Sequence, residues 1–402
     1  MTRPGAPPPP EATREAATAR PAAPGTPLRL QVRRTLLIAF LVAFMALCGL
    51  LLLAAVSGDT GVRGFLVGIA LAVLPLPVVL AAFSWLDRYE PEPRGLLAFA
   101  FFWGATVAAL AAAVLNTAST IAVARTVGPG QNVAVTAVFV APWVEEAAKG
   151  AAILAVLLFR RREFDGVVDG IVLAGLTGVG FAFTENVLYF GRAFLQGSHD
   201  LGLSGGFFAV GATFLLRGVL APFAHPLFTA MTGIGLGIAA RARPGPTRWL
   251  PPIGGYLVAV GLHAIWNLAS LSGLRGFVTG YVVVMIPAFA VAVAVATWSR
   301  RREGDTVAAR LPAYVDAGWL AQGDVDMLAS MPLRKQAVHW AESTQGVGAA
   351  RRMRDFQHAA TELAFLRDRA ERLGPAADFA VRERSLLAEV AQHRAALAGA
   401  GG

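Results

Sequence analysis

The chain has 402 residues, of which 55% are hydrophobic and only 15% are charged, and its mean hydropathy is +0.56. Soluble domains carry about 25% charged residues, so this composition excludes an ordinary soluble protein and predicts a polytopic membrane protein. The formal charge of +9 does not indicate nucleic-acid binding, because the basic residues gather at the ends of apolar runs, as the positive-inside rule expects. Arginine greatly outnumbers lysine, which favours a bacterial source with a high-GC genome.

Residues 1–34 are rich in Pro and Ala and lack hydrophobic periodicity, so they are predicted to form a disordered extension. A transmembrane domain is predicted over residues 35–299, because apolar runs long enough to cross about 30 Å of hydrocarbon recur through it. Eight such runs are expected, at 35–57, 64–86, 95–122, 133–159, 166–190, 207–240, 253–271 and 277–298. The run 207–240 is longer than one crossing requires, so it is expected to tilt, to kink at Pro222 or Pro226, or to split into two half-helices.

The loop arginines divide unequally between the two sides of these eight runs. One side carries Arg33, Arg34, Arg88, Arg94, Arg160, Arg161, Arg162, Arg241, Arg243, Arg248 and Arg300 to Arg302, and the other carries Arg63, Arg125, Arg192 and Arg275. This asymmetry predicts a multi-pass protein of the cell membrane with both termini in the cytoplasm. Residues 300–402 are charged, with apolar positions on one helical face, and predict a small cytoplasmic helical region. The expected fold is therefore an all-α bundle of about eight transmembrane helices.

The run 133–159 contains Glu145, Glu146 and Lys149, although each charge at the centre of a membrane helix costs about 3 kcal/mol on insertion scales. The lysine lies three and four residues after the two glutamates, so its ammonium can reach either carboxylate along the helix. Neutralisation by the single positive charge of Lys149 accounts for one carboxylate and leaves the second unexplained. Two neighbouring carboxylates in a low dielectric repel each other, which favours protonation of one and suits general acid/base chemistry.

The next run holds Glu185, which follows Gly175, Gly178 and Gly180. These glycines permit close helix packing, so a structural interhelical bond from Glu185 and a role in a functional site are both open. At the start of the same run, Asp165 and Asp169 suit a helix N-terminus, are candidates to pair with Arg160 to Arg162, and are predicted to be structural.

Only two of the six histidines, His225 and His263, fall within apolar runs, and both lie near mid-depth, as the paired glutamates do. His263 and Asn267 are four residues apart and share a helical face. A lone intramembrane histidine is usually a packing residue, but two at matched depth with a carboxylate pair form a candidate site.

Several motifs in this order resemble the PrsW family of intramembrane proteases. They are Glu-Glu-x-x-Lys at 145–149, Phe-Asp-Gly-Val-Val-Asp-Gly at 164–170, Glu185 with Asn186 and Tyr189, His225, and His263-x-x-x-Asn267, preceded by the loop Asp-Arg-Tyr-Glu-Pro-Glu-Pro at 87–93. The pattern is also similar to that of the wider superfamily of CAAX prenyl endopeptidases and bacteriocin self-immunity proteins. There, Arg usually follows the paired glutamates, whereas here Lys149 occupies that place, which favours PrsW.

The resemblance implies proteolysis of membrane-embedded or membrane-tethered proteins, including anti-sigma factors. The residues agree with hydrolysis: Glu145 or Glu146, with His225, is expected to deprotonate a water, and His263 with Asn267 to stabilise the oxyanion. Lys149 is expected to keep at least one glutamate ionised, and Glu185 completes the candidate catalytic set. The expected partners are a membrane-protein substrate and the lipid bilayer, with no nucleic acid.

The involvement of a metal is left open by the sequence. His225, His263 and Glu146 would form an open Zn²⁺ site, and PrsW-like proteins are often grouped with metallopeptidases. The glutamates nevertheless lack the His-Glu-x-x-His spacing of helical zinc sites, so we favour a metal-independent glutamate mechanism.

Two other classes of function compete with the protease. Membrane carboxylates and histidines also build proton relays, so a proton-coupled transporter is one alternative, although the chain has no evident inverted repeat. A non-catalytic membrane scaffold that acts through its cytoplasmic helices is the other.

Overall fold

The computed structural model describes residues 28–128, 130–161 and 163–398, and these residues form helices and loops without a strand. The all-α prediction is therefore confirmed for the described chain. The predicted disordered extension at 1–34 lies outside the described residues, except that 28–34 form the start of the first helix. The chain divides into a membrane unit, Arg29–Asp87 with Glu92–Ala296, and a C-terminal unit that comprises Thr297–Gly402 and the short segment Arg88–Pro91.

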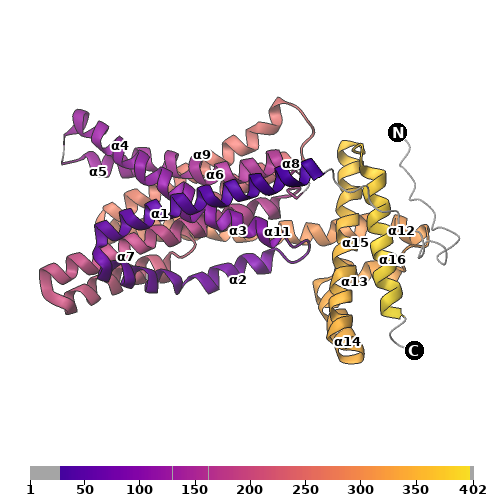
Figure 1. The fold of residues 1–402 in the computed structure, drawn as a ribbon. Helices are drawn as coiled ribbons and strands as arrows, with labels where there is room; N and C mark the ends of the chain where they lie inside the picture. The colour runs from indigo at the N-terminus through magenta and orange to yellow at the C-terminus, as the bar shows by residue number, and fades with distance from the viewer. Residues whose placement is uncertain (1–27, 129, 162, 399–402) are drawn as a thin grey trace. The chain divides into compact units, whose positions relative to one another are not determined.

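The membrane unit is built from helices that are interrupted at several points by π-helical turns (Figure 1). In chain order the elements are α1 (Leu28–Val73), α2 (Leu76–Leu86), α3 (Arg94–Phe102), η1 (Trp103–Ala108), α4 (Ala109–Val127), α5 (Asn132–Val135), η2 (Thr136–Val140), α6 (Ala141–Phe159), α7 (Val167–Phe214), η3 (Leu215–Leu220), α8 (Ala224–Arg241), η4 (Pro246–Trp249), α9 (Leu250–Leu271), α10 (Gly273–Gly280), η5 (Tyr281–Met285) and α11 (Ile286–Arg310), the last of which continues into the C-terminal unit. The short η4 is a 3₁₀ helix.

Five helical stretches of the described chain are long and apolar enough to cross a membrane, which identifies a multi-pass membrane protein. They are Thr35–Leu86, Arg94–Val127, Val167–Arg241, Pro246–Leu271 and Gly273–Asp316. The first and third, of 52 and 75 residues, exceed the roughly 20 residues that one crossing needs. Each contains two of the runs predicted from the sequence, and the run with the paired glutamates is outside the five. The expected number of about eight spans therefore stays a prediction.

Breaks inside the two longest stretches explain how each holds more than one predicted run. Gly61 interrupts α1 with a φ of 61°, and Gly202 interrupts α7 with a φ of 71°, a left-handed conformation that glycine adopts without strain. The α7 chain folds back there and brings Gly197 against Gly205. The approach is so close that a Cβ added at Gly197 would lie 2.5 Å from the Gly205 carbonyl oxygen. The predicted kink is also present: the helix stops at Leu220 and resumes at Ala224, on either side of Pro222.

Glycines allow α7 to lie directly against its neighbours, as the sequence predicted. A Cβ at Gly178 would lie 2.7 Å from the His225 carbonyl oxygen of α8, and a Cβ at Gly180 would lie 1.9 Å from the Phe101 carbonyl oxygen of α3. A side chain at either position would force the helices apart. The missing side chain at Gly178 therefore sets the distance between α7 and the backbone that carries His225. At the start of α7, Asp169 accepts hydrogen bonds from the backbone nitrogens of residues 165 and 166, in the helix-capping role expected of it.

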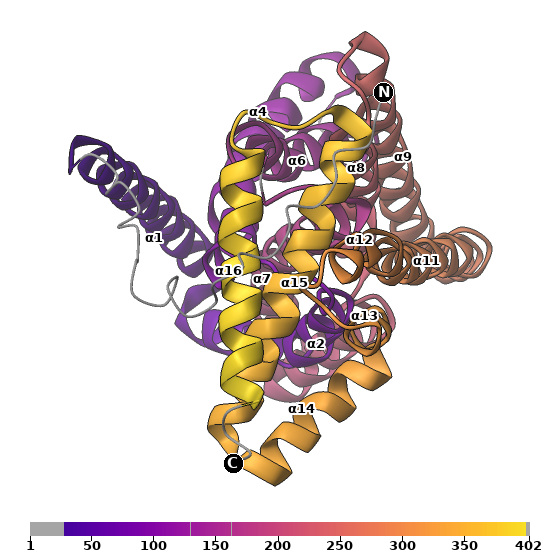
Figure 2. The same ribbon diagram turned by 90° about the vertical axis from the view of Figure 1, so that its right-hand side faces the viewer.

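The C-terminal unit has its own hydrophobic core. Its further helices are α12 (Pro312–Asp316), α13 (Gln322–Ala329), α14 (Met331–Gln345), α15 (Val347–Leu373) and α16 (Phe379–Ala398). Figure 2 shows α15 and α16 running side by side, and both contribute fully buried leucines such as Leu363 and Leu387. The segment Arg88–Pro91 joins this core through Tyr89, whose hydroxyl donates to the Ala329 carbonyl oxygen at 3.0 Å.

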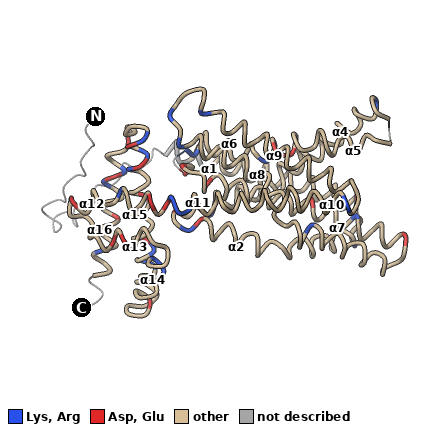
Figure 3. Tube along the Cα trace, turned by 180° about the vertical axis from the view of Figure 1, so that it is seen from behind, with Lys and Arg blue, Asp and Glu red and all other residues tan. Residues whose placement is uncertain are grey.

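Charged residues are distributed very differently in the two units. In Figure 3 the Cα trace of the membrane unit is largely tan, with few blue or red positions along its helices, whereas the C-terminal unit carries many of both. Charges inside the membrane unit are therefore exceptional and need a physical reason.

Candidate active site

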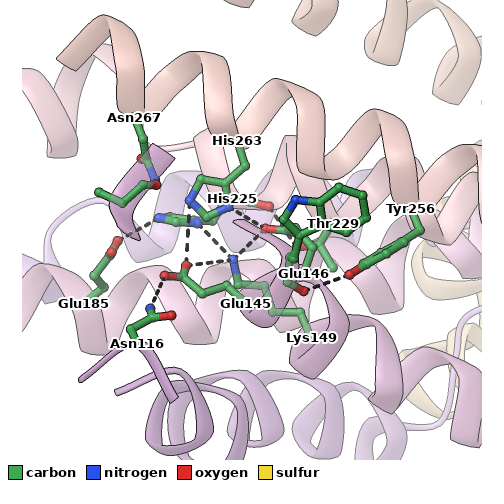
Figure 4. A network of polar contacts seen from close by, with 12 residues as sticks. Asn116, Glu145, Glu146, Lys149, Glu185, His225, Thr229, Tyr256, His263 and Asn267 are labelled. Carbon is green, nitrogen blue, oxygen red and sulfur yellow. Dashed lines mark hydrogen bonds and ion pairs between the residues drawn. The ribbon is translucent and has the colours of Figure 1, made fainter. Parts of the chain in front are cut away.

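The charged turn of α6 is buried inside the membrane unit. Glu146 and Lys149 are fully buried, and Glu145 is 6% exposed. Pro142 lies within the first two positions of α6, where a proline is tolerated because its missing N–H is not needed. The three charged side chains meet histidines from α8 and α9, as Figure 4 shows. The structure thus brings together six of the seven residues that the sequence nominated, and the seventh, Asn267, is treated separately below.

Glu146 is the more fully bonded of the two glutamates. Its Oε1 accepts from Lys149 Nζ at 2.8 Å and lies 3.0 Å from His263 Nδ1, and its Oε2 accepts from the Thr229 hydroxyl at 3.0 Å. Because a carboxylate only accepts hydrogen bonds, His263 carries its proton on Nδ1 and leaves Nε2 bare. Glu146 therefore orients Lys149 and His263 and has both of its oxygens engaged.

Glu145 differs because one of its oxygens is free of hydrogen bonds. Its Oε1 accepts from Asn116 Nδ2 at 3.0 Å, while Oε2 is buried and has no hydrogen-bond partner among the described residues. Oε2 lies 3.7 Å from Lys149 Nζ and 3.7 Å from His263 Nε2. A buried carboxylate oxygen left in this condition is costly unless a bound water, cation or substrate satisfies it.

His225 is held from two sides. Its Nε2 lies 2.7 Å from Glu185 Oε2, and its Nδ1 lies 3.1 Å from Lys149 Nζ. Since the carboxylate accepts and the ammonium donates, the proton is on Nε2 and the lone pair is on Nδ1. The rings of His225 and His263 are 5.1 Å apart between centroids. Two bare imidazole nitrogens and one free carboxylate oxygen thus converge on one buried space.

Glu185 brings with it residues that sequence reasoning missed. Arg217, in η3, donates to Glu185 Oε2 and, through Nε at 2.7 Å, to Asn186 Oδ1, and its guanidinium lies over the Tyr189 ring at 4.1 Å. The sequence contained a signal for Arg217, because an arginine inside the apolar run 207–240 needs a partner of opposite charge. Asn116 and Thr229 carried no comparable signal, because a single amide or hydroxyl is common in membrane helices.

Asn267 is directed to the backbone instead of to the histidines. Its Nδ2 donates to the Ala137 carbonyl oxygen in η2 at 2.8 Å. In a π-helical turn this carbonyl would accept from the residue five positions on, which is Pro142, a residue without an N–H. Asn267 therefore satisfies a carbonyl that the proline leaves unpaired, just before the helix that carries the glutamates.

The donor set fits a divalent metal ion. Glu145, His225 and His263 each offer a ligand atom, and these atoms lie within 4.8 Å of one another. A carboxylate with two imidazoles is a standard open zinc site, and the free Glu145 Oε2 is the orphaned atom that a cation would satisfy. Both histidines also have the outer carboxylate typical of metal ligands, Glu185 and Glu146. The triad contains Glu145 where the sequence had suggested Glu146, and Lys149 would have to release His225 Nδ1 for that nitrogen to act as a ligand.

Fold and site together define an all-helical, multi-pass membrane protein with a buried carboxylate–histidine cluster. Residues 92–292, half of the chain, match the family model described as the PrsW family of intramembrane metalloproteases. The chain belongs to this family, which confirms the resemblance and identifies an intramembrane protease. No curated protein and no solved structure matches the chain. The family gives no support to the transporter or scaffold alternatives.

Proposed function

We propose that this protein is an endopeptidase that hydrolyses peptide bonds of membrane-embedded or membrane-tethered proteins at the cluster formed by Glu145, His225 and His263. The observation that carries the proposal is the free Oε2 of Glu145, buried beside two bare imidazole nitrogens. Acceptor atoms gathered beside one buried ammonium suit the binding and activation of a water molecule. Anti-sigma-factor-like regulators are one substrate class that this activity would serve, in a cell membrane with both termini of the protease in the cytoplasm.

Glu145, and not Glu146, is assigned the role of general base. Both oxygens of Glu146 are engaged by Lys149, His263 and Thr229, so a proton taken up there would break existing bonds. Glu145 Oε2 can accept a proton from water without losing any hydrogen bond. Lys149, 3.7 Å away, stabilises the ionised form of this carboxylate.

A divalent ion such as Zn²⁺, if held by Glu145, His225 and His263, would supply Lewis-acid activation of water. The protein's own part is then to orient each ligand: Glu185 fixes His225, Glu146 fixes His263, and Asn116 fixes Glu145. The same contacts serve the metal-independent alternative, in which Glu145 alone removes the proton. Lys149 carries the one buried ammonium beside the reacting water and is assigned to stabilise the oxyanion, since Asn267 donates to Ala137.

Comparative proteomics of membrane fractions tests the activity and finds the substrate together. Cells that produce Glu145→Gln are compared with cells that produce the wild-type protein at equal abundance. An uncut membrane protein should accumulate with the variant, and the purified wild-type protease should cleave it in proteoliposomes. The proposal is wrong if Glu145→Gln, His225→Ala and His263→Ala proteins, each inserted and folded, all cleave as the wild type does.

Metal dependence is decided on the same purified protein. Chelator-washed protease is assayed for residual cleavage and for bound metal, and activity is then restored with Zn²⁺ or other divalent ions. Loss and recovery of activity with stoichiometric metal would establish the metalloprotease, and full activity without metal would establish the glutamate mechanism.

A further inference from the structure

Arg217 is an intramembrane arginine that is linked to His225 through one residue, Glu185. Its side chain is 17% exposed, and its charge is met by Glu185. The guanidinium uses two separate nitrogens, Nη2 towards Glu185 and Nε towards Asn186, and the Tyr189 ring covers its face. Three side chains from one turn of α7 thus hold Arg217 in one orientation.

Arg217 and His225 both donate to the same oxygen of Glu185. Glu185 Oε2 receives both Arg217 Nη2 and His225 Nε2, the latter at 2.7 Å. A paired arginine keeps the carboxylate ionised and stationary, so Glu185 can act only as an acceptor towards the imidazole. The hydrogen of His225 is thereby placed on Nε2. The 3.1 Å contact of Nδ1 with the Lys149 ammonium requires the same arrangement from the other side of the ring.

We infer that Arg217 is a positioning residue of this site, which holds Glu185 as the acceptor that locks His225 in its Nε2–H tautomer with the Nδ1 lone pair turned towards Glu145 and Lys149. Its importance for catalysis rests on the function proposed above, but the tautomer lock does not. The alternative is that Arg217 is purely structural and only joins η3 to α7. In that role its removal would lower stability and leave the imidazole unchanged.

Nitrogen NMR of imidazole-labelled protein in lipid separates the two roles, because protonated and bare ring nitrogens differ widely in chemical shift. The His225 signals are identified among the six histidines by their loss in His225→Asn. The wild type should show a protonated Nε2 and a bare Nδ1. With only the Lys149 contact left to hold the ring, Arg217→Met should show a minor but measurable fraction of the Nδ1–H tautomer, Glu185→Gln should show the same change, and Arg217→Lys should recover the wild-type pattern in part.

Arg192→Met is the matched control, because Arg192 also forms an ion pair with a carboxylate of the membrane unit, Asp59 at 2.5 Å, and has no contact with Glu185. It should leave the His225 signals as in the wild type. In cleavage assays Arg217→Met should lower kcat by about 10- to 100-fold with little change in KM, the usual effect of losing an outer-shell partner. Arg192→Met should change neither constant.

An unchanged Nε2–H tautomer in Arg217→Met would overturn the inference, whatever the rate of cleavage. Should Arg217→Met fail to fold, Arg217→Lys decides, since a lysine cannot bond Glu185 and Asn186 together and must shift the tautomer ratio measurably. If the wild-type protein cleaves no substrate, the proposed function fails, while the NMR result still accepts or rejects the lock. If cleavage occurs and Arg192→Met loses kcat as strongly as Arg217→Met, the catalytic consequence of the lock is rejected.

Discussion

Each unit of the protein contains a buried charge network, and the two networks differ in how completely they are paired. In the C-terminal unit, Asp368 receives Arg310 and Arg372 on its two oxygens, and Glu371 receives Arg310 and Arg367. None of the carboxylate oxygens in this network is a buried orphan among the described residues. A saturated network has no capacity for a ligand, and its role is to join helices.

The network of the membrane unit leaves capacity unused. Glu145 Oε2 has no hydrogen-bond partner among the described residues, and the unprotonated Nε2 of His263 lies 3.7 Å from it. Burial of such an atom costs about 1–3 kcal/mol, so a purely structural cluster would be more stable without it. The contrast indicates that burial of charge alone does not mark a functional site, whereas a buried carboxylate with an unsatisfied oxygen beside two histidines is a candidate for one.

Neutralising one carboxylate in each network should give the largest difference. Glu145→Gln removes the base and should lower kcat by about 10²- to 10⁴-fold. Glu371→Gln removes a half-buried carboxylate charge from the saturated network and should leave kcat unchanged, because it touches no reacting group. Both are measured by cleavage of one substrate in proteoliposomes. Equal losses from the two variants would show that the contrast has no catalytic meaning.

Replacing one cation in each network shows how much that cation contributes to the free energy of unfolding. Lys149→Met leaves Glu146 buried without its countercharge, so the free energy of unfolding should fall by about 3–5 kcal/mol. Arg310→Met should cost only about 1 kcal/mol, because its side chain is 26% exposed and Arg367 and Arg372 still face the carboxylates. Detergent-titrated unfolding of each purified variant measures both values. A larger loss for Arg310→Met would mean that Lys149 is not the main neutraliser of Glu146.

Asn267 offers a sharper test of how the site is built. As an oxyanion donor, its loss would reduce kcat by about 10²- to 10³-fold without lowering stability. As the partner of the Ala137 carbonyl, its loss should cost about 1–3 kcal/mol of stability, with a smaller change in kcat. We expect the second result for Asn267→Ala. Asn132→Ala is the matched control, since Asn132 also donates to a backbone carbonyl, that of Thr120, away from the glutamates.

Much of this arrangement could be predicted from composition and spacing. The helical class, the break near Pro222, the close packing at Gly178 and the convergence of the paired glutamates with both histidines all follow from sequence patterns. Intramembrane charges are so costly that their positions alone indicate a shared site.

The finer assignments depend on geometry that spacing does not contain. Glu145 and Glu146 are adjacent in sequence and chemically identical, so only the partners on other helices distinguish the free oxygen from the saturated ones. The role of Asn267 was equally hidden, because it depends on a π-helical turn and on the missing N–H of Pro142. Arg217 could have been predicted as part of the site, because the cost of burying its charge in an apolar run requires a partner.

A pH dependence of stability is expected from Asp87, a buried carboxyl at the end of α2 that has no cationic partner in contact among the described residues. Its two oxygens accept only from the Glu92 backbone nitrogen, each at 3.2 Å, and burial raises the pKa of Asp87 to about 7. Between about pH 4 and pH 7 the folded protein keeps a proton that the unfolded chain has released. Stability should therefore fall as pH rises through this range, by at most about 1.4 kcal/mol per pH unit.

Asp87→Asn should flatten this pH dependence, since the amide keeps an acceptor for Glu92 and has no proton to lose. The comparison is the midpoint of thermal unfolding at pH 5 and pH 7.5 for both proteins, with Glu371→Gln as a control from the saturated network. The wild type should lose more stability than Asp87→Asn between these pH values. Identical pH dependence in the two proteins would mean that Asp87 is ionised in the folded state, and that a carboxyl of the membrane unit can remain charged without the cation that Glu146 requires.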